Sequence, residues 1–277
     1  MDENAFTYAD PADPLWKRAL IGAIEAATGR DHIKRLYLRR QAEGWGARGF
    51  YETALSALSL DLRYDAARLD AIPKSGPLVV VANHPFGVLD GIAMAALMAR
   101  VRPDFRLLTN AVLLRAPELR EHMLPIDFTE TPKARRVSAE SRRAAIDYAK
   151  SGGCVVVFPA GAVSTSPDFW GRAAAIDGPW TSWLARLVAA ARGPVVPIYF
   201  VGQNSRLFQI ASHIHLNLRL ALFFHEVRRR IGTAFPVEIG APISWGDLAS
   251  LTDKTALTAW LRAAALALAP KNQPRPR

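Results

Sequence analysis

The sequence has very few of the features that mark several common protein classes. It holds one cysteine, Cys154, in 277 residues, which excludes an internal disulfide and a metal site built on several cysteines. It has no charge-free apolar stretch long enough to cross a bilayer. It has no Gly-x-Ser-x-Gly motif, which argues against a hydrolase built on a nucleophile elbow. The acidic start lacks an apolar signal-peptide core, so we expect the chain to stay in the cytoplasm.

Acidic residues are in the minority, with 25 Asp and Glu against 35 Lys and Arg and a formal net charge of +10. This balance favours an anionic partner such as nucleic acid, an acidic membrane surface, or a phosphorylated or carrier-bound substrate. No recognised motif that reads DNA or RNA is present, and the basic residues are spread along the chain. We therefore expect no nucleic-acid partner.

Three short apolar runs are typical of strands covered on both faces: 78–82, 154–158 and 195–201. Weaker strand patterns fall at 60–64, 105–109, 123–128 and 236–240. Helical patterns alternate with them, notably at 91–100, 133–150 and 180–192. This alternation predicts an α/β fold with a mixed, largely parallel central sheet flanked by helices.

The first apolar run ends at Asn83 and His84, within the motif Asn-His-Pro-Phe-Gly, and Asp90 follows where a helix begins. Strand ends are where open α/β sheets place their chemistry. A neutral imidazole takes a proton from a hydroxyl near pH 7, and a carboxylate on its other nitrogen fixes the tautomer. His84 and Asp90 are therefore candidate catalytic residues. Two alternatives stay open: Asp90 as only a helix N-cap, and His84 as an ordinary loop histidine.

Three blocks of the sequence occur in a characteristic order. They are Asn-His-Pro-Phe-Gly-x-x-Asp-Gly at 83–91, Phe-Pro-Ala-Gly at 158–161 and Val-Val-Pro-Ile at 195–198. Together they resemble the glycerolipid and lysophospholipid acyltransferase family, over roughly residues 60–245. The first block is closest to the bacterial hemolysin-like and aminolipid-acylating branch. The resemblance implies the glycerol-3-phosphate acyltransferase-like fold, with His84 as the base and Asp90 as its orienting group.

Substrate contacts are expected in and just after these blocks. Gly161 and the amides that follow it are placed to bind an anion, with help from Ser164 and Thr165. Gln203 and Asn204 follow the third run, where they either reach substrate or only begin a helix. The full set of expected substrate-binding residues is Asn83, Phe86, Gly87, Pro159, Gly161, Ser164, Thr165, Gln203 and Asn204.

The sequence departs from the family pattern at three places. Five residues separate His84 from Asp90, where four are commonest. The stretch 124–128 has no arginine, although the family's second block usually ends in one. Ala160 stands where the third block usually has glutamate. These losses fit a lyso-aminolipid acceptor better than lysophosphatidate.

The resemblance implies an enzyme that moves a fatty acyl group from acyl-carrier protein or coenzyme A to the hydroxyl of a lysolipid. It implies no metal and no prosthetic group. The expected partners are the lysolipid, the acyl thioester and an anionic membrane surface, at the cytoplasmic face of the inner membrane. The missing arginine and glutamate keep an alternative open, a catalytically inactive homologue that acts as a basic membrane-binding protein.

We expect three regions along the chain. Residues 1–59 form an N-terminal helical segment with amphipathic helices, 60–269 the acyltransferase domain, and 270–277 a disordered basic tail. Trp16 and Tyr37, with basic neighbours, suit helices that lie in a membrane interface. Two ordinary helices packed on the core are an equally favoured alternative.

Overall fold

The computed structural model describes residues 6–7, 9, 14–46, 49–129 and 131–271. Most of the polar start, residues 1–13, and residues 272–277 of the expected tail lie outside the described residues. The expectation of a disordered tail therefore stays a prediction.

Seven strands form one sheet in the order β1-β7-β6-β2-β5-β3-β4. Their bounds are β1 (Asp61–Arg63), β2 (Leu78–Ala82), β3 (Arg106–Asn110), β4 (Met123–Ile126), β5 (Cys154–Val157), β6 (Val195–Phe200) and β7 (Ala234–Ile239). All neighbouring strands pair in parallel except β6 and β7, which are antiparallel. The mixed, largely parallel sheet expected from the sequence is confirmed.

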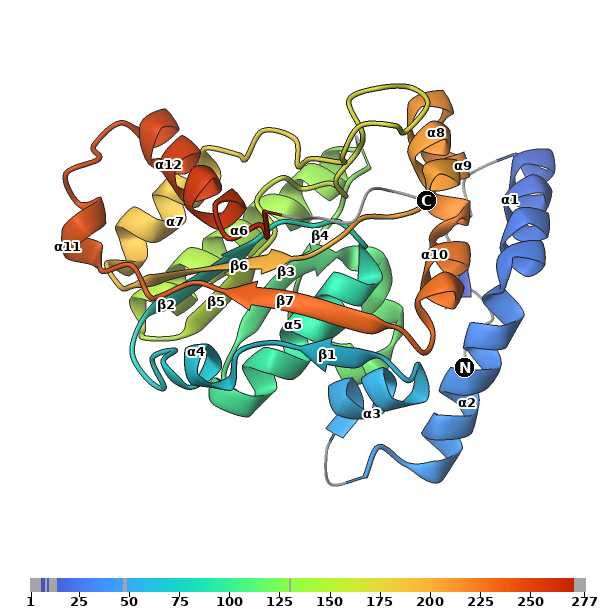
Figure 1. Cartoon of the computed structure of the whole chain (residues 1–277), viewed down its shortest axis with the longest axis horizontal. Helices are drawn as coiled ribbons and strands as arrows, with labels where there is room; N and C mark the ends of the chain where they lie inside the picture. The colour runs from blue at the N-terminus through green and yellow to red at the C-terminus, as the bar shows by residue number, and fades with distance from the viewer. Residues whose placement is uncertain (1–5, 8, 10–13, 47–48, 130, 272–277) are drawn as a thin grey trace.

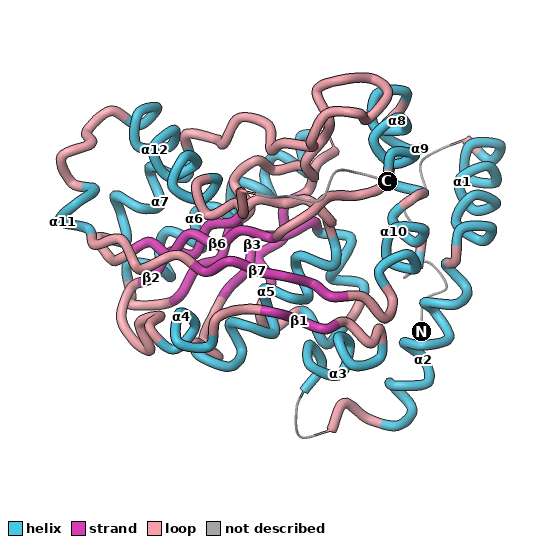
Figure 2. The backbone as a smooth tube through the Cα atoms, in the orientation of Figure 1, coloured by secondary structure: helices cyan, strands magenta, loops and turns pink. Residues whose placement is uncertain are grey.

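Helices cover both faces of this sheet (Figures 1 and 2). The N-terminal helices are α1 (Leu15–Thr28), α2 (Arg30–Glu43) and α3 (Gly49–Ala57). Between the strands lie α4 (Ala66–Asp70), α5 (Val88–Val101), the 3-10 turns η2 (Ala111–Arg115) and η3 (Pro117–Leu119), α6 (Pro132–Lys150), α7 (Trp183–Ala191), α8 (Arg206–Ile214), α9 (Leu216–Ala221) and α10 (Phe223–Arg230). After β7 come α11 (Trp245–Leu248) and α12 (Lys254–Leu266).

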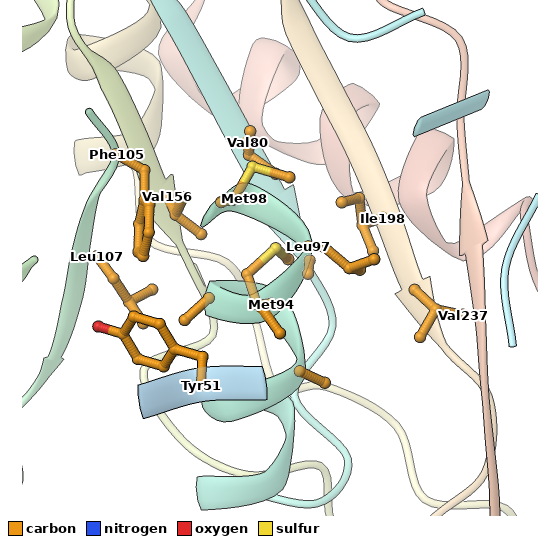
Figure 3. Packing of buried hydrophobic residues seen from close by; sticks show 14 of the residues in the cluster. Tyr51, Val80, Met94, Leu97, Met98, Phe105, Leu107, Val156, Ile198 and Val237 are labelled. Atoms are coloured by element: carbon orange, nitrogen blue, oxygen red, sulfur yellow. The ribbon is translucent and has the colours of Figure 1, made fainter. Parts of the chain in front are cut away.

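The alternation of side chains along β2 divides the core into two layers. Val80 and Ala82 join the core on the α5 side, together with Met94 and Met98 of that helix (Figure 3). Val79 and Val81 belong to the core on the opposite face of the sheet, which α6, α7 and α12 cover. All of β2 is buried, which is why its sequence is continuously apolar instead of alternating.

The structure differs from the sequence-based expectation in two helical segments. The helix expected over 113–122 is replaced by two 3-10 turns, since Pro117 lacks the amide hydrogen that an α-helix would need there. The single helix expected over 216–230 is two helices, α9 and α10. The break between them allows α10 to begin at Phe223, which packs against the turn after β2.

The N-terminal helices have different environments. Tyr51 and Leu55 of α3 are part of the core on the α5 side, so this helix packs as an ordinary core helix. Leu15, Trp16 and Leu20 of α1 are exposed. Within the described part of the chain, every helix is too short or too polar to cross a membrane.

Candidate active site

Three parallel strands, β2, β5 and β6, bring the sequence blocks together at one edge of the sheet. His84 follows the end of β2, and Phe158 follows the end of β5. The two rings stack with their centroids 4.3 Å apart. Because the carboxyl ends of neighbouring parallel strands lie at the same edge, residues 74 positions apart in the sequence become direct neighbours.

His84 and Asp90 form a close pair. Nδ1 of His84 lies 3.0 Å from Oδ2 of Asp90, and the exposed side-chain fractions are 19% and 0%. The same Oδ2 accepts hydrogen bonds from the backbone amides of Phe86, at 2.7 Å, and Gly87, at 3.0 Å. Asp90 therefore both closes the first turn of α5 and contacts the imidazole. Its position fits both a helix cap and a partner of the imidazole, and its catalytic role stays a prediction.

The turn between the two residues depends on Gly87. Its backbone has φ 74°, a left-handed conformation that glycine adopts without a steric penalty. A Cβ at this position would lie 2.6 Å from Cε1 of Phe223. The absence of a side chain at Gly87 lets α10 pack directly on this turn.

Burial raises the pKa of the Asp90 carboxyl above its ordinary value, because the charged form loses its hydration. The contact with His84 and the amides of Phe86 and Gly87 act in the opposite direction by favouring the carboxylate. The two amides hold the carboxylate in place, and its contact with His84 orients the imidazole with Nδ1 towards it. With the proton on Nδ1, Nε2 keeps its lone pair and is free to accept a proton.

The backbone of His84 is fixed by Asp177, a residue that the sequence analysis missed. The His84 amide donates to Oδ1 of Asp177 at 3.1 Å, and the Ser164 hydroxyl donates to the same oxygen at 2.5 Å. The indole of Trp180 donates to Oδ2 at 3.0 Å, and the Ser164 amide donates to the His84 carbonyl at 2.8 Å. The loop 161–178 is thus attached to the backbone of His84 near both of its ends. No local sequence signal marks an aspartate 93 residues away as the partner of His84.

Asn83 has a structural role in this arrangement. Its Nδ2 donates to the carbonyl of Phe200 at 3.0 Å, and its Oδ1 accepts from the Phe200 amide at 2.7 Å. The side chain is buried. The Asn83 side chain therefore extends the pairing of β2 and β6 beyond the last paired residues of the two strands. Both the oxygen and the nitrogen of its amide are used in these bonds.

The other expected substrate-binding residues lie around the same strand ends. Phe86 and Pro159 are buried, and Gly161 is exposed in the turn after β5. The hydroxyl of Ser164 donates to Asp177 and that of Thr165 to the Val163 carbonyl. These residues are brought together by the fold, and their contact with substrate stays a prediction.

Gln203 and Asn204 follow β6 and are partly and fully buried, respectively. Oε1 of Gln203 accepts from the Ala175 amide at 2.8 Å, which connects it to the loop 161–178. Within the described residues, Nε2 of Gln203 and both amide atoms of Asn204 have no hydrogen-bond partner. Buried amides without partners are uncommon in proteins, so these two side chains keep hydrogen-bonding capacity beside the site.

Arg230 is a second residue that sequence reasoning missed. Its guanidinium carbon lies 4.1 Å from the centroid of the Phe86 ring, and Nη2 donates to the Gln203 carbonyl at 3.1 Å. Burial lowers the pKa of Arg230, and the charges of Glu226 and Asp90 oppose this effect. The guanidinium of Arg230 thus packs against the turn that carries the His84–Asp90 pair, through its contact with the ring of Phe86.

An apolar cavity of about 200 Å³ begins at the start of α5. Val88, Leu89, Gly91 and Ile92 of that helix form one wall. The other walls come mainly from α2, α3, the segment between them, η2, η3 and α10. The aromatic side chains of the lining are Phe6, Tyr37, Trp45, Phe50, Tyr51, Phe223 and Phe224. Since Val88 and Leu89 lie between His84 and Asp90 in the sequence, the cavity shares its wall with the candidate catalytic turn.

Comparison with known proteins gives consistent matches. Two curated relatives are both named lyso-glycine lipid O-acyltransferase. One, from Phocaeicola vulgatus, is 25% identical over 200 residues, 67% of this chain and 66% of that protein. The other, from Bacteroides thetaiotaomicron, is 26% identical over 193 residues, 67% of this chain and 68% of that protein. The chain thus spans about two thirds of the length of these relatives.

Among solved structures, the crystal structure of the 1-acyl-sn-glycerophosphate acyltransferase PlsC from Thermotoga maritima aligns with a TM-score of 0.49 and 17% identity. The alignment covers 91% of this chain and 79% of that one. A family model described as acyltransferase matches residues 33–264. This match begins within α2, ends within α12 and includes all seven strands of the sheet. Because it spans far more than half of the sequence, the chain belongs to the acyltransferase family.

Proposed function

We propose that the protein is an O-acyltransferase that moves a fatty acyl group from a thioester to the hydroxyl of a lysolipid. The observation that carries this proposal is the position of the His84–Asp90 pair. The imidazole is partly exposed, its carboxylate partner is buried, and an apolar cavity starts in the same turn and helix. A base beside an apolar cavity suits a reaction in which one substrate carries a fatty acyl chain.

In the proposed reaction, the oxygen of the acceptor hydroxyl attacks the thioester carbonyl while Nε2 of His84 takes the hydroxyl proton. The carbon–sulfur bond then breaks, the acyl group stays on the acceptor oxygen as an ester, and the imidazolium returns the proton to the departing thiolate. Asp90 stabilises the imidazolium in between. No acyl-enzyme forms, since the acceptor is itself the nucleophile.

The acceptor that we propose is a lyso-aminolipid, with a lyso-glycine lipid as the first choice. Both curated relatives carry the name lyso-glycine lipid O-acyltransferase. The absence of the arginine and the glutamate that the family commonly uses, at 124–128 and at Ala160, agrees with an acceptor other than lysophosphatidate. Nε2 of Gln203 and the side-chain amide of Asn204, which no described residue satisfies, are proposed to bind its polar part.

The proposed donor is acyl-carrier protein or coenzyme A carrying the acyl group, and the proposed place of action is the cytoplasmic face of the inner membrane. An excess of basic residues, +10 in formal charge, suits both an acidic or phosphorylated donor and an anionic lipid surface.

The test is acyl transfer with the purified chain, labelled palmitoyl-acyl-carrier protein or palmitoyl-coenzyme A, and a panel of lysolipids that differ in head group. We expect a product with lyso-glycine lipid and little or none with lysophosphatidate. The matched control is the same lysolipid with its hydroxyl methylated, which removes the nucleophile and keeps the head group. A folded protein that transfers acyl groups from neither donor to any acceptor would contradict the proposal and favour an inactive homologue.

Gly91 offers a test of the cavity as the site of the acyl chain. A Cβ added to this helical residue meets no atom within 4 Å, and the residue lines the cavity. We therefore expect the side chain of Gly91→Leu to occupy part of the cavity. We expect transfer of palmitoyl groups to fall about tenfold or more relative to octanoyl groups, because the longer chain needs the space.

The control for this variant is Gly91→Ala. Alanine removes the entropic disadvantage of glycine in a helix, about 1 kcal/mol, so its melting temperature should rise slightly while chain-length preference stays close to that of the wild type. An equal loss of palmitoyl and octanoyl transfer in Gly91→Leu would show that the acyl chain lies elsewhere.

A further inference from the structure

Arg219 of α9 is a partly buried cation that makes a single hydrogen bond to the part of the chain that the structure describes. Its Nη2 donates to the carbonyl of Val163, and its Cζ lies 5.4 Å from the centroid of the Phe208 ring. Burial lowers the pKa of Arg219, because the charged form loses hydration, and no described carboxylate forms an ion pair with it. A guanidinium has five N–H groups, so most of its donors are left for a ligand.

The backbone of the loop 161–178 connects Arg219 to the candidate active site. Val163 accepts the hydrogen bond from Arg219. The next residue, Ser164, donates its amide to the carbonyl of His84 at 2.8 Å. Two consecutive residues of one loop therefore bind the guanidinium and the backbone of the proposed base, which sets this cation beside the site.

Aromatic rings give a second connection. The ring of Phe208, over which Arg219 lies, has its centroid 5.3 Å from that of Phe223, and Phe223 packs on the turn at Gly87. The strands agree with this placement, because β6 is parallel to β2 and is followed by α8. The edge of the sheet that carries His84 therefore faces α8, α9 and α10, which follow one another at that end of the molecule (Figure 1).

The acidic side chains of this region are engaged elsewhere. Asp177 accepts from a backbone amide, a hydroxyl and an indole. Asp168 accepts from three amides of the turn that follows it, and Glu226 from the residue that precedes α8. Residues 206–221, which include α8 and α9, contain no Asp or Glu. An anion that enters here therefore meets Arg219 without competition from a nearby carboxylate.

The chemistry of a guanidinium on a ring points to the class of anion. The contact with Phe208 limits the orientations of the plane, and the remaining N–H groups form a fork that fits a carboxylate through two parallel hydrogen bonds. An amino acid joined to a fatty acyl group through its nitrogen keeps a free carboxylate. The stretch 124–128 has no arginine, and Ala160 has no charge. A cation from α9 would therefore replace the usual one, where no glutamate repels the ligand.

We propose that Arg219 binds the carboxylate of the acceptor head group and so selects acceptors that carry one. The identity of this ligand as an acceptor rests on the proposed function. Binding of an acyl amino acid does not itself require acyl transfer, so the two proposals can be tested separately. The phosphate groups of the thioester donor are the other anions that a guanidinium would hold, and the experiment distinguishes them from the acceptor.

The test is calorimetric titration of the full chain, without donor, with monomeric N-dodecanoylglycine and with its uncharged methyl ester. Neither compound has a hydroxyl, so neither can react. The wild type should bind the carboxylate about 10- to 100-fold more tightly than the ester, the range of charge-assisted hydrogen bonds. Arg219→Gln should bind the two compounds equally. Arg219→Lys should keep an intermediate preference, because it retains the charge without the planar fork.

Arg206→Gln is the matched control. Nε of Arg206 also donates to a backbone carbonyl of the same loop, that of Trp170 at 3.4 Å, but this side chain is exposed. The control should keep the wild-type preference for the carboxylate, since an exposed cation contributes little to a buried contact. The ratio of the two dissociation constants is the deciding quantity, because a merely structural role of Arg219 would weaken the binding of both compounds equally.

Three outcomes would overturn the proposal: a wild type that does not prefer the carboxylate, a preference that persists in Arg219→Gln, and an equal loss of preference in Arg206→Gln. An Arg219→Gln protein with a raised KM for palmitoyl-coenzyme A and unchanged binding of N-dodecanoylglycine would assign the guanidinium to the donor instead. Carboxylate-selective binding without acyl transfer to any acceptor would refute the proposed function alone. Transfer to lyso-glycine lipid and to its methyl ester with equal kcat/KM would refute the role of Arg219 alone.

Discussion

Replacing His84 with alanine is expected to lower kcat for acyl transfer about 10²–10⁴-fold, the range that a general base contributes. The variant loses the imidazole that would accept the hydroxyl proton. The fold should survive, because the hydrogen bonds that join this residue to Ser164 and Asp177 are made by its backbone. The substitution removes one ring stacked on Phe158. We therefore expect kcat and kcat/KM to fall by the same factor, with a small change in melting temperature.

His122→Ala is the matched control for this experiment. His122 is also stacked on a phenylalanine, Phe105, with centroids 4.4 Å apart, but it precedes β4 and so lies at the other edge of the sheet. Its loss should leave kcat within about twofold of the wild type, because only a change in packing reaches the site. A His84→Ala protein with more than about a tenth of wild-type activity would exclude His84 as the base, since a general base contributes at least about 10²-fold.

The parts of the fold that were predictable from the sequence depend on local patterns. The unbroken apolar run of β2 indicates a strand covered on both faces, and the structure places it at the centre of the sheet. Gly87, between His84 and Asp90, marks the turn that brings the two side chains together. The direction of β7 was not predictable, because its six residues read the same in a parallel or an antiparallel pairing.

The rest of the site comes from contacts between residues far apart in the chain. Asp177 follows a loop with no regular pattern, and only the folded chain brings its carboxylate to the amide of His84. Phe223 and Arg230 lie in a helix whose pattern indicates an ordinary amphipathic surface, yet they pack on Gly87 and Phe86. A sequence motif identifies residues that act within one turn of the chain. It carries no information on the elements that close the site from other directions.

Replacing Asp90 with asparagine is expected to separate catalysis from stability. Asparagine keeps an oxygen that accepts from the amides of Phe86 and Gly87, so the start of α5 should be preserved. It removes the negative charge that would stabilise the imidazolium of His84, while the same oxygen still faces Nδ1. By analogy with the aspartate of serine-protease triads, we expect kcat to fall about 10³-fold or more.

The difference in stability between this variant and the wild type should change with pH in a definite direction. Burial raises the pKa of Asp90 in the folded protein above its ordinary value of 3.8, so the folded state binds the proton more tightly than the unfolded state. The wild type therefore loses stability as the pH rises through the folded-state pKa, and the asparagine variant does not. The melting temperature of Asp90→Asn minus that of the wild type should be smallest near pH 4 and should increase towards pH 8.

Asp65→Asn is the matched control for the pH experiment. Asp65 also accepts from two amides at the start of a helix, those of Ala67 and Arg68, but it is exposed. Asparagine caps a helix about as well as aspartate, so this variant should follow the wild-type melting curve at every pH and keep full activity. If Asp90→Asn instead lost stability at pH 8 while retaining activity, the carboxylate would be a structural cap and His84 would act without an orienting partner.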